Sequence, residues 1–76
     1  MDLSKEGEAI KKRLSKNRLS QSWLVDRLKA NGTHVDNSYL SQCLNGFLET
    51  DKAIEVIYKA NSILDRYERK RRREVR

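Results

Sequence analysis

The sequence predicts an all-α protein, a small bundle of about four helices in which the last helix is extended. Three observations support this fold class: the chain has no proline, Val and Ile are sparse, and no long stretch alternates between apolar and polar residues as a β-strand would. With 76 residues the chain makes one small domain. A core of that size supplies only about 3–5 kcal/mol of stability.

Apolar stripes predict the first two helices. Spacings of four, three and four predict a helix over residues 4–16, with these residues on one face: Leu3, Gly7, Ile10 and Leu14. On that stripe, Gly7 would permit close packing. A second helix over residues 21–30, capped by Ser20 and stopped by Asn31-Gly32, should turn three residues inward: Leu24, Val25 and Leu28.

Residues 35–46 predict a third helix, at residues 37–45, and read Val-Asp-Asn-Ser-Tyr-Leu-Ser-Gln-Cys-Leu-Asn-Gly. Asp36 can accept hydrogen bonds from the first free backbone N–H groups, and Gly46 can adopt the left-handed conformation that ends a helix. A polar face on a short helix is most often solvated surface. These side chains can also donate and accept hydrogen bonds, which suits reading base edges in a DNA groove: Asn37, Ser38, Ser41, Gln42 and Asn45.

The last helix should begin at Asp51, after a capping Thr50, and continue to about Arg73. Apolar residues recur along it at spacings of three and four: Ala53, Val56, Ile57, Ala60, Ile63, Leu64 and Tyr67. Its first half should complete the core, whereas its second half should extend beyond the region that three short helices can cover. The exposed stripe is therefore expected to form a homodimer interface through Ile63, Leu64 and Tyr67.

Positive charge is concentrated at one end of the sequence. Residues 66–76 hold seven Lys and Arg against two Glu, which accounts for most of the net charge of +6. A weaker basic cluster ends the first helix: Lys11, Lys12, Arg13, Lys16 and Arg18. Such charge suits a nucleic acid or an acidic membrane surface. We divide the chain into a DNA-binding domain at residues 1–68 and a basic tail at 69–76, where phosphate contacts are expected from Arg69, Arg71 and Arg72; a solvated helix end is the alternative.

Other function classes find little support in the sequence. It contains no carboxylate pair, nucleophile with a base, metal cluster or glycine-rich phosphate loop, so we expect no enzyme, no cofactor, no metal and no small-molecule substrate. Cys43 is the only cysteine, is expected to be buried, and fits a reducing, cytoplasmic setting. No apolar run reaches the roughly 20 residues of a membrane span, and no membrane association is expected.

The order of these features resembles the Cro/CI-like (XRE) family of phage and bacterial repressors, which have a lambda-repressor-like helix-turn-helix. The family pattern runs roughly Gln-x-x-Leu-Ala-x-x-Leu, a short turn, then Val-Ser-x-x-x-Ile-Ser-x-x-Glu-x-Gly. Here Gln21 and Leu24 open the second helix, and residues 35–46 align without a gap, so the match spans residues 8–65. The chain departs from the pattern in its longer turn before residue 35, and in Val25 and Leu44, which stand where the family has alanine and glutamate.

The resemblance implies a transcriptional regulator that binds double-stranded DNA in a sequence-specific way, a repressor from a phage or mobile element, acting as a homodimer. It implies that Gln21 clamps a phosphate at the start of the second helix and that Asn45 contacts the backbone. The base-reading set would be Asn37, Ser38, Ser41 and Gln42. Tyr39 would stack on a sugar or touch a thymine methyl, or would be half-buried against the turn.

Two other classes of function stay open. One is a protein-binding adaptor on the same fold, an antirepressor or inhibitor that contacts its partner through Trp23 and the last helix. The other is a basic helical module on RNA or an acidic membrane. Trp23 is itself expected to pack on the turn at residues 33–35, unless it meets DNA or a partner. Side-chain amides at Asn37 and Gln42 favour DNA, because neither alternative needs them.

Overall fold

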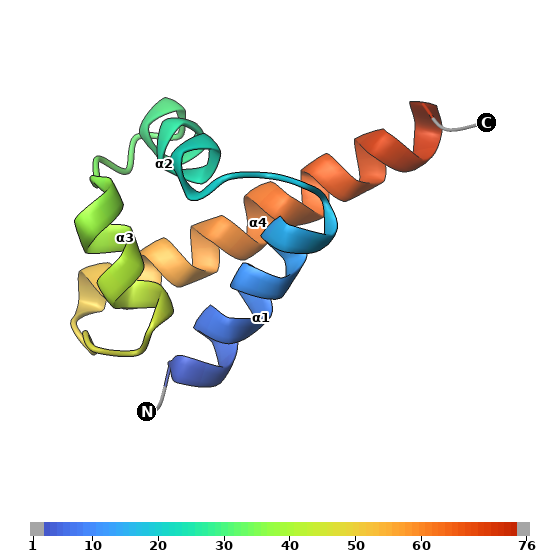
Figure 1. The fold of residues 1–76 in the computed structure, drawn as a ribbon. Coiled ribbons are helices and arrows are strands. Elements are labelled where there is room, and N and C mark those ends of the chain that lie inside the picture. Colours follow the sequence, from blue (N-terminus) through green and yellow to red (C-terminus); the bar gives the residue numbers. More distant parts are fainter. Residues whose placement is uncertain (1–2, 75–76) are drawn as a thin grey trace.

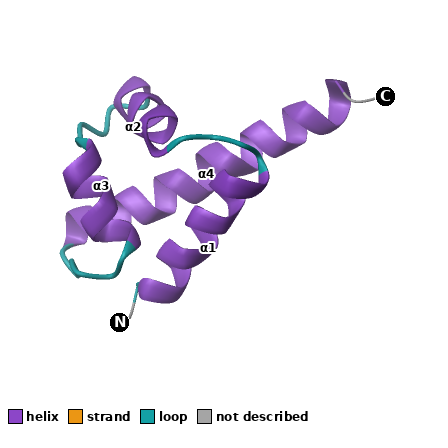
Figure 2. Ribbon diagram, in the orientation of Figure 1, coloured by secondary structure: helices purple, strands orange, loops and turns teal. Residues whose placement is uncertain are grey.

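The computed structural model describes residues 3–74 as four helices joined by short turns (Figures 1 and 2). The helices are α1 (Ser4–Lys16), α2 (Gln21–Ala30), α3 (Asn37–Leu44) and α4 (Asp51–Glu74). No strand occurs within residues 3–74, so the all-α prediction is confirmed. In Figure 1, α4 runs the length of the molecule, and the three shorter helices gather around its first two thirds.

The core is continuous, and all four helices contribute to it. α3 packs against the other three helices, and both α1 and α2 also pack against α4. The inward residues predicted for each helix are buried. The largest fully buried side chains are Ile10, Leu24, Leu28, Leu40, Leu44, Leu64, Val56 and Cys43. A cluster drawn from every helix makes each one depend on the others for burial of its apolar face.

Gly7 is the point of closest approach between α1 and α3. A Cβ atom placed on Gly7 would overlap the backbone carbonyl of Leu44, at the end of α3. Gly46, which follows α3 with a φ of +75°, also lies close to α1, since an added Cβ would come within 2.8 Å of the Ser4 Cβ. Glycine at these two positions therefore lets the start of α1 lie directly on the end of α3.

The first three helices end in the same way, with an asparagine as the C-terminal cap. The side-chain amides of these asparagines donate to the backbone carbonyl four residues earlier, at 2.9, 2.8 and 2.8 Å: Asn17, Asn31 and Asn45. The residue after each asparagine has a positive φ, of 58°, 86° and 75°: Arg18, Gly32 and Gly46. Arg18 is the one member of the three that is not glycine.

The residue after the positive φ then closes each helix. The N–H groups of Leu19, Thr33 and Phe47 donate to carbonyls of the preceding helix at 2.8, 2.8 and 3.0 Å, five residues back. This pattern is the Schellman motif, which satisfies carbonyls that a helix end leaves free. The same backbone geometry therefore ends α1, α2 and α3.

The helix starts are capped as the sequence predicted. Ser20, Asp36 and Thr50 accept hydrogen bonds from the backbone N–H three residues on, at 3.0, 2.7 and 3.1 Å. Two boundaries differ from the prediction. α3 ends at Leu44, with Asn45 as its cap, one residue before the predicted end, and α4 has 24 residues and ends at Glu74, one residue beyond the predicted Arg73. Residues 69–74 are helical, in line with the predicted extent of the last helix.

The prediction that the outer half of α4 lies uncovered is wrong at Leu64, whose exposure is 0%. Ile63 and Tyr67 are half-buried, and the ring of Tyr67 meets that of Trp23 edge-on, with centroids 5.3 Å apart. Trp23 therefore packs on α4. α2 supplies part of the cover through Trp23, while Ile63 and Tyr67 keep part of their surface exposed.

Among the described helices, none combines the length and the apolar content that crossing a bilayer demands. This holds for α4 as well, which is long enough to span but is rich in charged residues along its length.

Candidate nucleic-acid interface

The exposed face of α3 carries a set of uncharged polar side chains. α3 turns Leu40, Cys43 and Leu44 into the core, so its polar residues are left on the outer side. Spacings of four place the polar residues in two adjacent rows, 37-41-45 and 38-42. Ser41 is half-buried, and the other four are exposed: Asn37, Ser38, Gln42 and Asn45. The structure therefore gathers the predicted base-reading set on one surface.

The N-termini of α2 and α3 meet beside this face. The Gln21 side-chain amide donates to the backbone carbonyl of Asn37 at 2.9 Å, and the Asn37 amide donates to the Ser22 hydroxyl at 3.3 Å. Gln21 and Asn37, both predicted to contact DNA, are thus in direct contact. Two helix N-termini side by side add partial positive charge to the same surface, which favours an anion such as phosphate.

Asn45 has a structural role at the other end of α3. Its amide group donates to the Ser41 carbonyl at 2.8 Å and lies 3.4 Å from the Ser41 hydroxyl, while its Oδ1 accepts a hydrogen bond from Lys11 Nζ. Because Lys11 belongs to α1, the packing of α1 on α3 places a cation at the edge of the polar face. An open groove of about 430 Å³ between α1 and the end of α3 includes Lys11, Lys12 and Asn45 in its lining.

Tyr39 is half-buried and packs against the core, so the structure agrees with the burial reading of this residue. The ammonium of Lys52, on the first turn of α4, lies 5.1 Å from the centroid of the Tyr39 ring. A cation at this distance is attracted to the face of an aromatic ring. Lys52 is a second cation beside α3, and sequence reasoning did not identify it because its proximity depends on how α4 packs.

Cys43 lies on the inner side of α3 with an exposure of 0%. Burial raises the pKa of its thiol, and the nearby positive charge of Lys52 opposes this rise without cancelling it. A buried thiol with a raised pKa has little of the reactive thiolate form. Cys43 is therefore part of the core, as predicted.

The arginines predicted to meet phosphate lie at the far end of α4. Arg69 is exposed, and Arg71 Nη1 donates to the Asn17 side chain at 3.2 Å, which ties it to the end of α1. The side chain of Arg72 lies outside those that the structure describes. With a rise of about 1.5 Å per residue, Arg71 is about 30 Å along α4 from Asp51, which lies near α3. The structure does not bring these arginines to the α3 face.

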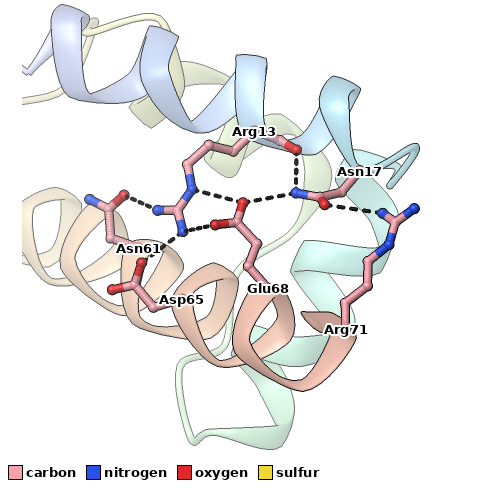
Figure 3. A network of polar contacts seen from close by, with 6 residues as sticks. All are labelled: Arg13, Asn17, Asn61, Asp65, Glu68 and Arg71. Carbon is pink, nitrogen blue, oxygen red and sulfur yellow. Dashed lines mark hydrogen bonds and ion pairs between the residues drawn. The ribbon is translucent and has the colours of Figure 1, made fainter. Parts of the chain in front are cut away.

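Arg13 joins α1 to the outer half of α4 through a polar network (Figure 3). Its guanidinium donates to Asp65 at 2.7 Å, to Glu68 at 3.0 and 3.3 Å, and to Asn61 at 3.2 Å. Asn17 donates to the same Glu68 carboxylate at 2.9 Å. Hydrogen bonds from Arg13 and then Asn17 hold the pKa of Glu68 below its ordinary value, and the Glu68 hydrogen bond raises the pKa of Arg13.

This network removes Arg13 from the predicted basic cluster, since its charge is neutralised within the protein. Sequence reasoning missed the role of Arg13. A signal was present in the spacing of its partners, because Asn61, Asp65 and Glu68 recur at four and three residues and so share one side of α4.

Neither a family model, nor a curated protein, nor a solved structure matches this chain. What the chain binds is therefore inferred from the α3 face, the two helix N-termini beside it, and the cations Lys11 and Lys52 at its edges.

Proposed function

We propose that this chain is a sequence-specific double-stranded DNA-binding transcriptional regulator, a repressor of a phage or mobile element, that reads the major groove with α3. One observation carries the proposal: α3 presents a continuous exposed face of uncharged side chains that both donate and accept hydrogen bonds. A side-chain amide such as that of Asn37 or Gln42 matches the major-groove edge of adenine, which offers one acceptor and one donor.

The surroundings of α3 supply the sequence-independent part of the binding. The adjoining N-termini of α2 and α3 direct their partial positive charge toward a phosphate, and Gln21 stands at the first of them. Lys11 and Lys52 border the face on opposite helices, α1 and α4. Lys and Arg near phosphates provide most of the affinity for DNA through release of counterions, whereas the amides provide the choice of site.

The proposal includes a homodimer on a two-fold operator, with half-sites about 10 to 10.5 base pairs apart or a multiple of that. Because Leu64 is buried, we place the contact between copies elsewhere on α4. Ile54 and Tyr58 are one turn apart on its surface and are 39% and 76% exposed. Sedimentation of the protein at micromolar concentration, alone and with DNA, measures the oligomeric state.

The proposal is tested by selecting bound duplexes from a random pool and then measuring single-base variants of the enriched duplex. We expect Gln42→Ala to leave folding intact, since its side chain is exposed, and to remove about 1–3 kcal/mol of discrimination at one or two base pairs. Ser62→Ala, a polar truncation on α4, is the control and should leave discrimination unchanged.

Equal discrimination by Gln42→Ala and the unsubstituted protein would contradict the reading role of α3. A pool from which no duplex is enriched would contradict DNA recognition altogether and would favour a protein-binding adaptor on the same fold.

A further inference from the structure

A groove on the side of α4 that faces α2 has an aromatic floor and a cationic rim. It measures about 210 Å³, and its lining includes Trp23, Ile63 and Tyr67 as well as the cations Arg27, Arg66 and Lys70. Drug-sized ligands occupy pockets of about 300–1,000 Å³, so this groove suits a single side chain rather than a whole small molecule.

The aromatic floor is already ordered by contacts within the protein. The rings of Trp23 and Tyr67 meet at an interplanar angle of 74°, and the Arg27 guanidinium lies 5.6 Å from the centroid of the Trp23 ring. The Trp23 ring is thus engaged both by a second ring and by a cation, an arrangement that holds the Arg27 charge at the groove.

Acids whose side chains the structure describes do not neutralise the cations at the rim. None of the ion pairs found among the described residues includes Arg27, Arg66 or Lys70. The nearest acids on the outer half of α4, Asp65 and Glu68, point instead toward Arg13 and α1 (Figure 3). Three such cations, set around an apolar floor, call for an anionic ligand that also carries an apolar group.

We infer that this groove binds a short acidic peptide segment of a partner protein, with one aromatic or branched side chain on the floor and carboxylates at the rim. Guanidinium groups bind carboxylates through paired N–H donors, which makes Arg27 and Arg66 suitable contacts for Asp or Glu flanking the apolar side chain. The half-buried Trp23 and Tyr67 supply a rigid amphipathic surface of the kind enriched at protein interfaces.

The groove is separate from the α3 face, and the inference does not rest on DNA binding. Successive residues of a helix differ by about 100° in direction. Ser22 faces Asn37 at 3.3 Å, whereas Trp23 begins the row that continues through Arg27 toward α4. The groove and the α3 face therefore lie on different sides of α2.

The fluorescence of Trp23 provides a direct test, because it is the only tryptophan in the chain. The probe is the blocked pentapeptide Glu-Asp-Phe-Asp-Glu, titrated to about 1 mM, the range of weak recognition. We expect a saturable change in Trp23 emission. Two control peptides should give none: one with Gln and Asn in place of the acids, and one with Ala in place of Phe.

A matched pair of substitutions on α2 separates the groove from general charge. Arg27 and Lys29 are both exposed cations in the last turn of α2, but only Arg27 lines the groove. Arg27→Glu should weaken peptide binding about tenfold, whereas Lys29→Glu should weaken it less than about twofold. Lys70→Glu, on the opposite wall, should act like Arg27→Glu and covers the case in which Arg27→Glu disturbs the Trp23 ring.

Several results would overturn the inference. Equal effects of Arg27→Glu and Lys29→Glu would mean that the peptide senses only net charge. Displacement of the peptide by single-stranded oligothymidine would make the groove a nucleic-acid site. An emission that changes with protein concentration, without peptide, would indicate a second copy of this chain. No emission change at all would leave the groove without this ligand, while selection of a duplex by α3 would be unaffected.

Discussion

At the scale of single residues, Arg18 adopts a left-handed backbone conformation that glycine would adopt at lower energy. Its φ of 58° lies in the left-handed region, which disfavours a residue with a Cβ by about 1–2 kcal/mol. The two equivalent positions after α2 and α3 hold glycine. Arg18 keeps this geometry because the N–H groups of Arg18 and Leu19 close the last turn of α1, at 3.1 and 2.8 Å.

We therefore expect Arg18→Gly to stabilise the protein by about 0.5–1 kcal/mol, the conformational cost relieved less the greater entropy of glycine in the unfolded chain. Urea unfolding measures the free energy. Arg18→Ala is the matched control: it removes the side chain but keeps the Cβ, so it should not stabilise. A glycine variant no more stable than the alanine variant would show that φ imposes no cost here.

Features that depend only on residues close together in the sequence could be predicted, whereas contacts between helices could not. Ser20, Asp36 and Thr50 were identifiable as caps because a cap bonds only to the helix it starts. The small size of Gly7 indicated close packing, but its partner, the carbonyl of Leu44, is a contact between helices 37 positions apart in sequence. The left-handed conformation of Arg18 was not predicted, because its helix-ending motif lacks the glycine found in the other two. A shared signal was present, since an asparagine precedes all three positive-φ residues.

At the scale of elements, α4 shows where prediction from periodicity ends. The spacing of its apolar residues identified its buried stripe, and Ala53, Val56 and Ala60 are buried as that stripe requires. Periodicity did not reveal that Trp23 and Arg13 would cover the outer half, because that cover comes from two other helices. The same limit applies to the candidate site. The polar face of α3 could be predicted from the sequence, but the positions of Lys11 and Lys52 beside it depend on how α1 and α4 pack.

The Arg13 network gives the α1·α4 pair a pH dependence. Glu68 has a folded-state pKa below its ordinary value of 4.5, so its contribution is fully present above that value and is lost as the pH falls through the lower, folded pKa. We expect Glu68→Gln to reduce the free energy of unfolding by about 1 kcal/mol at pH 7, a value discounted for the partial exposure of the pair. The difference from the unsubstituted protein should shrink as the pH is lowered below 4.5.

Glu55→Gln is the control, because Glu55 forms only a loose, exposed pair with Lys59 at 3.9 Å within α4. Its effect should stay below about 0.5 kcal/mol. Thermal or urea unfolding of both variants at several pH values makes the comparison. A Glu68→Gln deficit that persists unchanged at acidic pH would mean that packing, rather than the charge on Glu68, fastens α4 to α1.

At the scale of the whole molecule, α4 sets the distance between the α3 face and the basic end of the chain. The molecule is 40 Å long, and Figure 1 shows α3 beside the start of α4 and the C-terminal end projecting away from it. The span of about 30 Å along α4 is close to one turn of duplex DNA, about 34–36 Å. A duplex seated on α3 could therefore meet the basic end only at phosphates roughly a turn away.

Because the arginines at the end of α4 lie far from the α3 face, they should increase the affinity for DNA without affecting which DNA sequence is preferred. We expect replacement of Arg69 and Arg72 by Gln to lower the slope of log affinity against log salt by about 0.9 for each phosphate that an arginine no longer neutralises. Preference for the selected duplex over a scrambled one should persist, since phosphates carry no base identity. Arg71 is left in place because it bonds to Asn17 and so supports the fold.

Lys5→Gln combined with Lys29→Gln removes the same charge from exposed positions outside the predicted interface, and its slope should change less. If the two double variants lower the slope equally, the arginines contribute only net charge to the field around the protein. If the arginine variant loses its preference between duplexes at an unchanged slope, the end of α4 contacts bases, and site choice is not confined to α3.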